Sequence, residues 1–266
     1  MSELDGEAIK PRELLQRLLK VQDELAEQTA VHPFVLDDNL ASLEHLLGLS
    51  PVECDVLALM VYRDQIPGMR DTCNLIDGTE GVQGFASLTA CMLDYPVNQV
   101  RDAFSVRSRL LGAGLMVPPS NYRDGPLELS PGLADVLLHH ADAISAIQRQ
   151  YSDQDRPVRH RLDDFQHLAG VLGTLVAFLQ GGLNGTLTGV NILIHGHPGT
   201  GKTQLVRAVA VFLGVSLYEI RSADNCGSPI SAAERFSSYR CCQSLLAGDE
   251  SALLLFDECD DVLSNS

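Results

Sequence analysis

The sequence predicts an α/β domain, with a parallel sheet and flanking helices, preceded by a mainly α-helical region. Two observations predict the α/β domain. A glycine-rich segment at 196–203 lies between an apolar run and a helical run, and a second apolar run at 252–256 ends in two acidic residues. The third observation is the helical spacing of apolar residues through the first 150 residues. A chain of 266 residues is long enough for two domains.

The first elements of the chain are helices. Apolar residues recur at helical spacing over 12–28 and again over 39–47, where a glycine ends the pattern. A third helix has a clear start signal: Ser50 as N-cap, Pro51 at the first helical position and Glu53 completing a capping box. We expect its apolar residues to be buried on most sides.

The next segment alternates turns and short elements. Residues 71–84 are rich in Asp, Gly, Asn and Thr and predict a loop. Helices are then expected at 86–92 and 97–111, and a pair of short strands at 115–117 and 127–129.

The order of helix, turn, helix and hairpin resembles a winged-helix domain over residues 50–138. Its second helix carries Arg101, Arg107 and Arg109, as a DNA-reading helix would. However, residues 1–150 hold 11 Lys and Arg against 22 Asp and Glu, a net charge of −11. Because DNA-binding modules have a basic surface, the acidic balance favours a protein partner over nucleic acid.

A domain boundary is expected after this region. Residues 134–151 predict one helix, and the polar, arginine-containing stretch that follows predicts a linker. We therefore expect a helical regulatory or interaction domain at 1–150, a linker at 151–161 and the α/β domain at 162–266.

Residues 196–203 fit the P-loop pattern of glycine, four free positions and Gly-Lys-Thr. A buried strand is expected before the loop at 191–195, and a helix after it at 204–213. In this arrangement backbone N–H groups at a helix N-terminus surround the phosphates, Lys202 reaches the β- and γ-phosphates, and the Thr203 hydroxyl binds Mg²⁺. The expected ATP-binding residues are Gly196, His197, Pro198, Gly199, Thr200, Gly201, Lys202, Thr203 and Gln204.

The second motif is the apolar run that ends in Asp257 and Glu258, a Walker B pattern. Carboxylates at the end of a buried parallel strand face the nucleotide crevice. We expect Asp257 to hold Mg²⁺ together with Thr203, and Glu258 to act as a catalytic residue beside Lys202 by orienting the attacking water. One strand, at 216–221, and one helix, at 231–246, fit between the two motifs.

These pieces resemble an AAA+ ATPase. The resemblance rests on the acidic and aromatic segment at 162–165, an apolar helix at 168–179, the glycine-rich 181–189 and the two motifs. It implies the large AAA+ subdomain, ATP and Mg²⁺ as ligands, ATP hydrolysis, and a homo-oligomeric ring in the full-length protein. It also implies adenine contacts from His167 or Leu168. Kinases and GTPases lack the acidic pair; DExD helicases share it, but the loop form Gly-x-Pro-Gly-Thr-Gly-Lys-Thr is closer to AAA+.

Two departures from the family pattern limit the resemblance. Residues 225–230 lack the aromatic residue with which many AAA+ unfoldases grip a threaded chain. The chain also ends soon after the Walker B motif, so the sensor residues, the arginine finger and the small helical subdomain would lie beyond Ser266. We therefore expect a C-terminally truncated ATPase domain that binds ATP weakly and turns it over slowly by itself.

Composition argues against several classes of protein. The net charge of −16 argues against a protein that mainly neutralises nucleic-acid phosphates. Seven scattered cysteines without a C-x-x-C pair predict reduced thiols rather than disulfides or zinc. The polar, acidic N-terminus has no signal peptide, and the most apolar segment is too short to span a bilayer. We expect a cytoplasmic protein without a membrane partner.

Three functions remain open. The first is an AAA+ ATPase that remodels an unknown protein partner. The second is a nucleic-acid-associated loader or regulator that binds DNA through the winged helix. The third is a switch in which ATP occupancy, without steady turnover, controls assembly.

Overall fold

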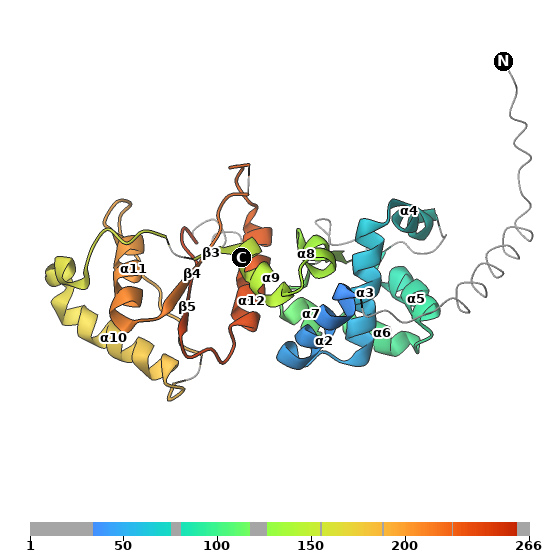
Figure 1. The fold of residues 1–266 in the computed structure, drawn as a ribbon, viewed down its shortest axis with the longest axis horizontal. Coiled ribbons are helices and arrows are strands. Elements are labelled where there is room, and N and C mark those ends of the chain that lie inside the picture. The colour runs from blue at the N-terminus through green and yellow to red at the C-terminus, as the bar shows by residue number, and fades with distance from the viewer. Residues whose placement is uncertain are drawn as a thin grey trace, which may run out of the picture. The chain divides into compact units, whose positions relative to one another are not determined.

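A computed structural model describes residues 34–75, 81–117, 127–154, 156–187, 189–224 and 226–259. The helix expected at 12–28 lies outside these residues. The helical part contains α2 (Val35–Leu47), α3 (Pro51–Gln65), α4 (Pro67–Leu75), α5 (Gly81–Leu93), α6 (Val97–Ala103), α7 (Arg109–Gly112), α8 (Leu133–His139) and α9 (Ala143–Tyr151), with strands β1 (Met116–Val117) and β2 (Glu128–Leu129) (Figure 1). The part with the larger sheet contains β3 (Ser152–Asp153), the 3₁₀ helix η1 (Leu162–Leu168), α10 (Ala169–Leu183), α11 (Lys202–Leu213), β4 (Ser216–Ile220), α12 (Ala232–Leu245) and β5 (Ala252–Leu255). From Val35 onward the chain forms one compact unit.

The N-terminus of α3 confirms the predicted capping box. The Ser50 hydroxyl accepts a hydrogen bond from the Glu53 N–H at 3.3 Å, and the Glu53 carboxylate accepts one from the Ser50 N–H at 2.8 Å. The second oxygen of Glu53 accepts the Arg109 N–H at 2.8 Å. This buried carboxylate therefore ties the start of α7 to the start of α3.

Three predictions in the helical part are wrong. Within the loop expected at 71–84, residues 71–75 are instead the end of α4 and residues 81–84 the start of α5, whereas 76–80 lie outside the described residues. Pro67 opens α4 at a position where its missing N–H costs nothing. The single helix expected at 97–111 is α6 and α7 with a turn between them, because Ser108 caps a new helix.

The single helix expected at 134–151 is likewise two helices, α8 and α9. The buried Asn39 side chain holds the break between them. Its amide donates to the carbonyls of Leu137, at 2.9 Å, and His140, at 2.7 Å, and its oxygen accepts the Ala143 N–H at 3.3 Å. A side chain from α2 therefore satisfies the backbone groups that the break releases.

The short hairpin is confirmed. Strands β1 and β2 pair antiparallel, with Met116 opposite Leu129 and Val117 opposite Glu128. The winged-helix interpretation stays a prediction, and the arginines on which DNA reading would depend are distributed over α6, the following turn and α7 rather than along one helix.

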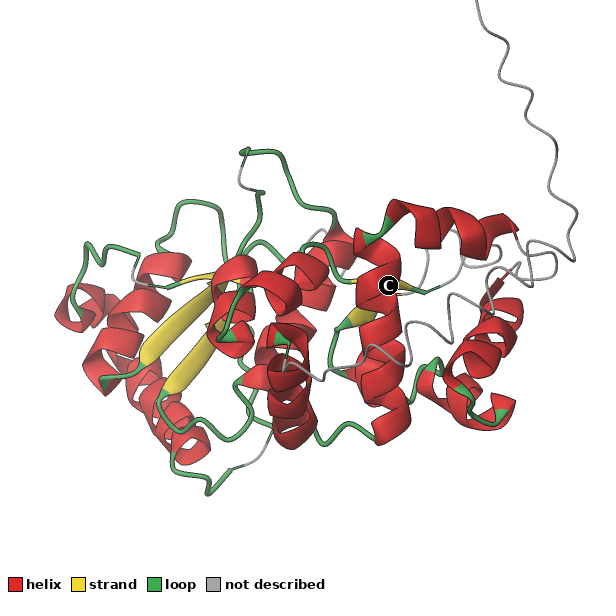
Figure 2. Ribbon diagram, turned by 45° about the vertical axis from the view of Figure 1, so that its right-hand side comes forward, coloured by secondary structure: helices red, strands yellow, loops and turns green. Residues whose placement is uncertain are grey.

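A mixed sheet of order β3-β4-β5 organises the α/β part (Figure 2). Strands β4 and β5 are parallel over four residue pairs, from Ser216 opposite Ala252 to Glu219 opposite Leu255, and β3 adds antiparallel to β4. The start of the expected linker is thus part of the sheet. Helices α11 and α12 lie on opposite sides of the sheet (Figure 1).

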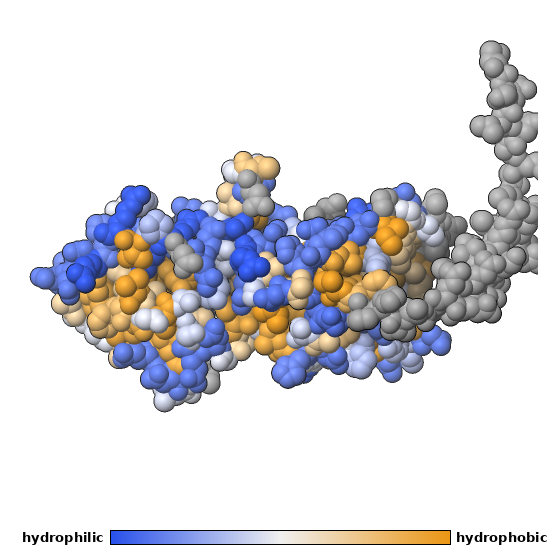
Figure 3. Space-filling view, viewed as in Figure 1, coloured by the Kyte–Doolittle hydropathy of each residue, from blue (hydrophilic) through white to orange (hydrophobic). Residues whose placement is uncertain are grey.

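The strand expected at 191–195 is absent: this segment has no regular secondary structure. An apolar run becomes a strand only where a neighbouring strand pairs with it, and none of the described residues does so. Its side chains are consequently exposed, with Ile192 at 41% and Leu193 at 68%. Helix α10 likewise has no buried residue, and apolar side chains gather on the surface around it (Figure 3).

The main core fills the helical part and extends to Cys241, Cys242 and Leu245 of α12. A smaller core under the P-loop helix contains Phe165, Leu205, Ala208 and Val209. The seven cysteines are not joined in disulfides in the structure.

Helix α12 meets the hairpin at a buried polar cluster formed by Gly114, Ser130 and Ser237. The Gly114 carbonyl accepts hydrogen bonds from the hydroxyls of Ser130, at 2.6 Å, and Ser237, at 3.1 Å, and these hydroxyls lie 2.8 Å apart. Gly114 has a φ of +69°, and a Cβ atom there would lie 2.5 Å from the Ser237 carbonyl oxygen. Only glycine fits this conformation and this contact.

Candidate nucleotide and magnesium site

The P-loop runs directly into α11. Gly199 and Gly201 have φ angles of +78° and +85°, and Gly201 is the N-cap of the helix. These left-handed conformations, which favour glycine, turn the chain so that the free N–H groups of the first helical turn lie at the loop. A helix N-terminus of this kind attracts phosphate through both the N–H groups and the helix dipole.

The lysine of the motif folds back over its own loop. The Lys202 ammonium donates hydrogen bonds to the carbonyl oxygens of Gly196, at 2.9 Å, and His197, at 3.0 Å. The Thr200 hydroxyl donates to the same His197 carbonyl at 2.8 Å. The side chain that would contact phosphate is therefore already at the mouth of the loop.

The two sequence motifs meet at Thr203 and Asp257. The Thr203 hydroxyl, in the first turn of α11, donates to a carboxylate oxygen of Asp257 at 2.5 Å, across 54 positions of sequence. Asp257 follows the end of β5 by two residues, so the sheet brings the acidic pair to the P-loop. A hydroxyl and a carboxylate oxygen side by side are the donor set that Mg²⁺ prefers, so these residues fit that ion.

Glu258 lies at the same end of β5 but does not contact the loop. Its side chain is exposed, and no hydrogen bond joins it to the P-loop in the described part of the chain. Its φ is +50°, which is uncommon for a residue other than glycine, and its N–H donates to the Asp257 carboxylate at 3.0 Å.

The other predicted binding residues differ in exposure. Residues 196–200 are exposed, whereas Gly201, Lys202, Thr203 and Gln204 are partly buried. The Gln204 side chain accepts the Arg159 N–H at 3.3 Å, so the segment that precedes η1 lies along the start of α11. The roles assigned to all these residues remain predictions.

Sequence reasoning missed the part played by Phe165. Its ring is buried against α11, and a Cβ atom at Gly201 would lie 3.7 Å from it. The rings of His160 and His167 flank it, with centroids at 6.2 and 6.3 Å. Leu168 packs against the same small core. The signal for this position was an aromatic residue directly after two acidic ones, but spacing alone did not tell which side chain would reach the loop.

Arg207, one helical turn after Thr203, was also missed. Its guanidinium forms two 2.7 Å hydrogen bonds with the nearly buried Glu219 carboxylate of β4. The hydrogen bond with Glu219 raises the pKa of Arg207 above its ordinary value, and the charge of Asp257 adds to this. The positive charge of Arg207, held by Glu219, therefore lies close enough to Asp257 to interact with its carboxylate.

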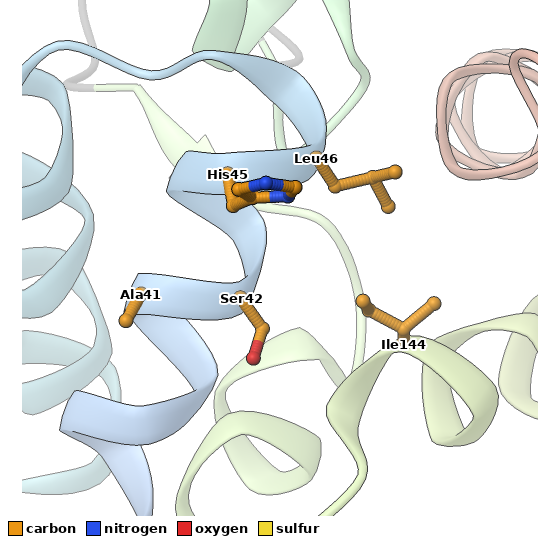
Figure 4. Close-up of a pocket in the computed structure, with 5 residues that line it drawn as sticks. All are labelled: Ala41, Ser42, His45, Leu46 and Ile144. Carbon is orange, nitrogen blue, oxygen red and sulfur yellow. The ribbon is translucent and has the colours of Figure 1, made fainter.

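A surface depression lies away from these residues. About 470 Å³ in volume, it is lined by Ala41, Ser42, His45, Leu46 and Ile144 (Figure 4). It is shallow and contains none of the motif residues, so the site is assigned from the chemistry of the loop and not from the size of a hollow.

No helix in the described ranges is long and apolar enough to cross a membrane. No solved structure matches the chain. The family model of the AAA ATPases, the ATPase family associated with various cellular activities, matches residues 192–266. This match covers the P-loop, β4, α12 and the acidic end of β5. The chain therefore carries, at residues 192–266, a domain of the AAA family of ATPases.

Proposed function

We propose that this domain binds ATP together with Mg²⁺ and hydrolyses it. The observation that carries the proposal is the 2.5 Å hydrogen bond between Thr203 and Asp257, because it joins the phosphate-binding loop to the acidic end of a parallel strand. Neither motif alone requires the other to be near.

The residues divide the work. The N–H groups at the start of α11 and the Lys202 ammonium bind the phosphates, and Thr203 and Asp257 hold the magnesium ion. When bound, the ion neutralises charge that develops on the phosphate oxygens. Glu258 orients a water molecule for in-line attack on the γ-phosphorus; the bond to the β-γ bridging oxygen breaks, and the products are ADP and inorganic phosphate.

The experiment is ATP binding and turnover by the 266-residue chain and its variants. Lys202→Ala is expected to lose binding. Glu258→Gln is expected to keep binding and to lose turnover by about 100-fold or more, the usual contribution of such a group. Glu250→Gln, a substitution of another exposed glutamate in the loop before β5, is the matched control and keeps both properties.

The outcomes separate the alternatives. A native chain with undetectable binding, or a Lys202→Ala protein that binds as well as the native one, contradicts the proposal. If Glu258→Gln keeps normal function in cells, ATP acts as an occupancy switch.

For the biological role, we propose that the protein is a homo-oligomeric AAA+ ATPase that remodels a protein partner recruited by the acidic helical part. The net charge of −11 over residues 1–150 and the break between α6 and α7 support a protein over DNA. In addition, the Arg109 guanidinium lies against the backbone of Gly48. A gel-shift titration with duplex DNA at low salt tests this; tight, salt-sensitive binding favours the loader or regulator instead.

A further inference from the structure

Arg235 of α12 is a charged side chain that is almost fully buried, at 3% exposed, beside the acidic end of β5. It lies in the second turn of the helix, after a capping box that Ser231 and Glu234 form. Burial of a guanidinium is costly unless its N–H groups find acceptors. The acceptors that Arg235 uses therefore indicate what the side chain does.

Two of its acceptors are the backbone carbonyls of the Walker B pair. One nitrogen of the Arg235 guanidinium donates to the Asp257 carbonyl at 2.5 Å, and another donates to the Glu258 carbonyl at 3.2 Å. The guanidinium also lies 4.7 Å from the centre of the Phe256 ring. One side chain thus contacts three consecutive residues at the point where β5 ends.

The backbone that it holds is unusual. Glu258 has a φ of +50°, a conformation that persists in a non-glycine residue only where its surroundings fix it. The Glu258 N–H donates a hydrogen bond to the Asp257 carboxylate, and the Glu258 carbonyl accepts one from Arg235. The dihedral angles of Glu258 determine the direction in which its side chain leaves the backbone.

The helix that carries Arg235 is itself anchored. Two residues further on, Ser237 bonds to the Gly114 carbonyl and contacts Ser130, and Cys241 and Cys242 of the same helix are fully buried. A group on a packed helix fixes its partners more closely than one on a loop.

We propose that Arg235 is a positioning residue for Glu258. By binding the carbonyls of Asp257 and Glu258, it keeps the Glu258 backbone in its left-handed conformation and directs the carboxylate toward the attacking water. This inference rests on the proposed ATPase function, because it assigns Arg235 to the step in which Glu258 acts.

The test compares Arg235→Lys with the native chain. Lysine keeps the charge but cannot donate from two nitrogens of a planar fork. Turnover is expressed per bound ATP, so that a smaller fraction of folded protein in the variant does not lower the measured rate constant. We expect kcat to fall between about 10-fold and 100-fold, with KM for ATP changed by less than about 2-fold, because only the orientation of a reacting group is altered. Arg70→Gln, which removes an exposed arginine of α4, is the control and leaves both values unchanged.

A double variant identifies the route. If Arg235 acts through Glu258, Arg235→Lys has little further effect in a Glu258→Gln protein. An equal fall in kcat in both backgrounds overturns the inference, and so does a rise in KM that matches the fall in kcat.

Amide hydrogen exchange provides a readout that needs no ATP. In Arg235→Lys the Glu258 amide is expected to exchange faster than in the native chain, whereas Arg70→Gln leaves it unchanged. Unchanged exchange at Glu258 overturns the inference even where turnover falls. If the native chain binds no ATP, the proposed function fails, and the exchange experiment alone decides whether Arg235 holds this backbone.

Discussion

Replacement of Gly114 by alanine should weaken the junction between the hairpin and α12. The first cost is conformational, because the left-handed φ of +69° disfavours any residue with a Cβ by about 1 kcal/mol. The new Cβ would also lie 2.5 Å from the Ser237 carbonyl oxygen and 3.0 Å from the Cys241 nitrogen. Both are backbone atoms of a packed helix, so we expect an overpacking cost of about 1 to 3 kcal/mol.

Gly185→Ala is the matched control. Gly185 has the same φ of +69°, and a Cβ there would meet no atom within 4 Å. Both substitutions carry the same conformational cost in the folded state and the same entropic gain from a less flexible unfolded chain. The difference between the two variants therefore isolates the clash with α12, about 1 to 3 kcal/mol.

The assay is urea denaturation followed by circular dichroism, with the free energy of unfolding obtained from the midpoint and slope. The two positions belong to the same compact unit, from Val35 onward, which permits the comparison. If Gly114→Ala and Gly185→Ala lose stability equally, within about 0.5 kcal/mol, α12 is not packed against Gly114 as described.

Three further predictions concern Asn39, Asp153 and Cys242. Asn39→Leu should lower the free energy of unfolding by about 3 kcal/mol in urea titrations, since three backbone groups lose their partner; a loss below about 0.5 kcal/mol contradicts this. Burial raises the pKa of the Asp153 carboxyl, but two neighbouring arginines outweigh this and hold the pKa below its ordinary value. Its stabilisation is therefore present above about pH 4 and lost as the pH falls through the folded-state pKa, so Asp153→Asn should flatten the loss of stability on acidification. The prediction is contradicted if the free energy of unfolding of Asp153→Asn falls with pH as steeply as that of the native chain. Burial raises the pKa of the Cys242 thiol to about 12, so iodoacetamide at pH 8 should alkylate the exposed Cys226 and leave Cys242 unmodified until urea unfolds the chain. Peptide mass spectrometry checks this, and equal labelling of the two thiols in the folded protein contradicts it.

Local signals predicted the ends of helices well. Ser50 and Glu53 cap α3, and Gly214 ends α11 with a φ of +69°, because these interactions span only a few residues. The positions at which one predicted helix divides into two depend instead on contacts between residues far apart in the sequence. Asn39 holds the gap between α8 and α9 from about 100 positions away, and Glu53 binds the first N–H of α7 from 56 positions away. Periodicity within a helix cannot report such partners.

The site divides in the same way. Motif spacing predicted a site that includes Lys202, Thr203 and Asp257, because phosphate and magnesium chemistry requires these residue types in a fixed order, and the structure brings Thr203 and Asp257 together. Arg235 gave no sequence signal for its contacts with Asp257 and Glu258, since they are made to backbone carbonyls, which every residue has. The strand expected at 191–195 failed because an apolar run does not tell whether a pairing strand is present.

The contacts of Lys202 within its own loop orient its ammonium group in the absence of ATP. An ammonium has three N–H donors, and two of them bond to the carbonyls of Gly196 and His197. The third can be directed to a phosphate oxygen while both loop contacts are kept. Under the proposed function, Lys202→Ala would therefore remove two contacts that hold the loop as well as a phosphate ligand, and its loss of ATP affinity would be an upper limit for the lysine-phosphate contact.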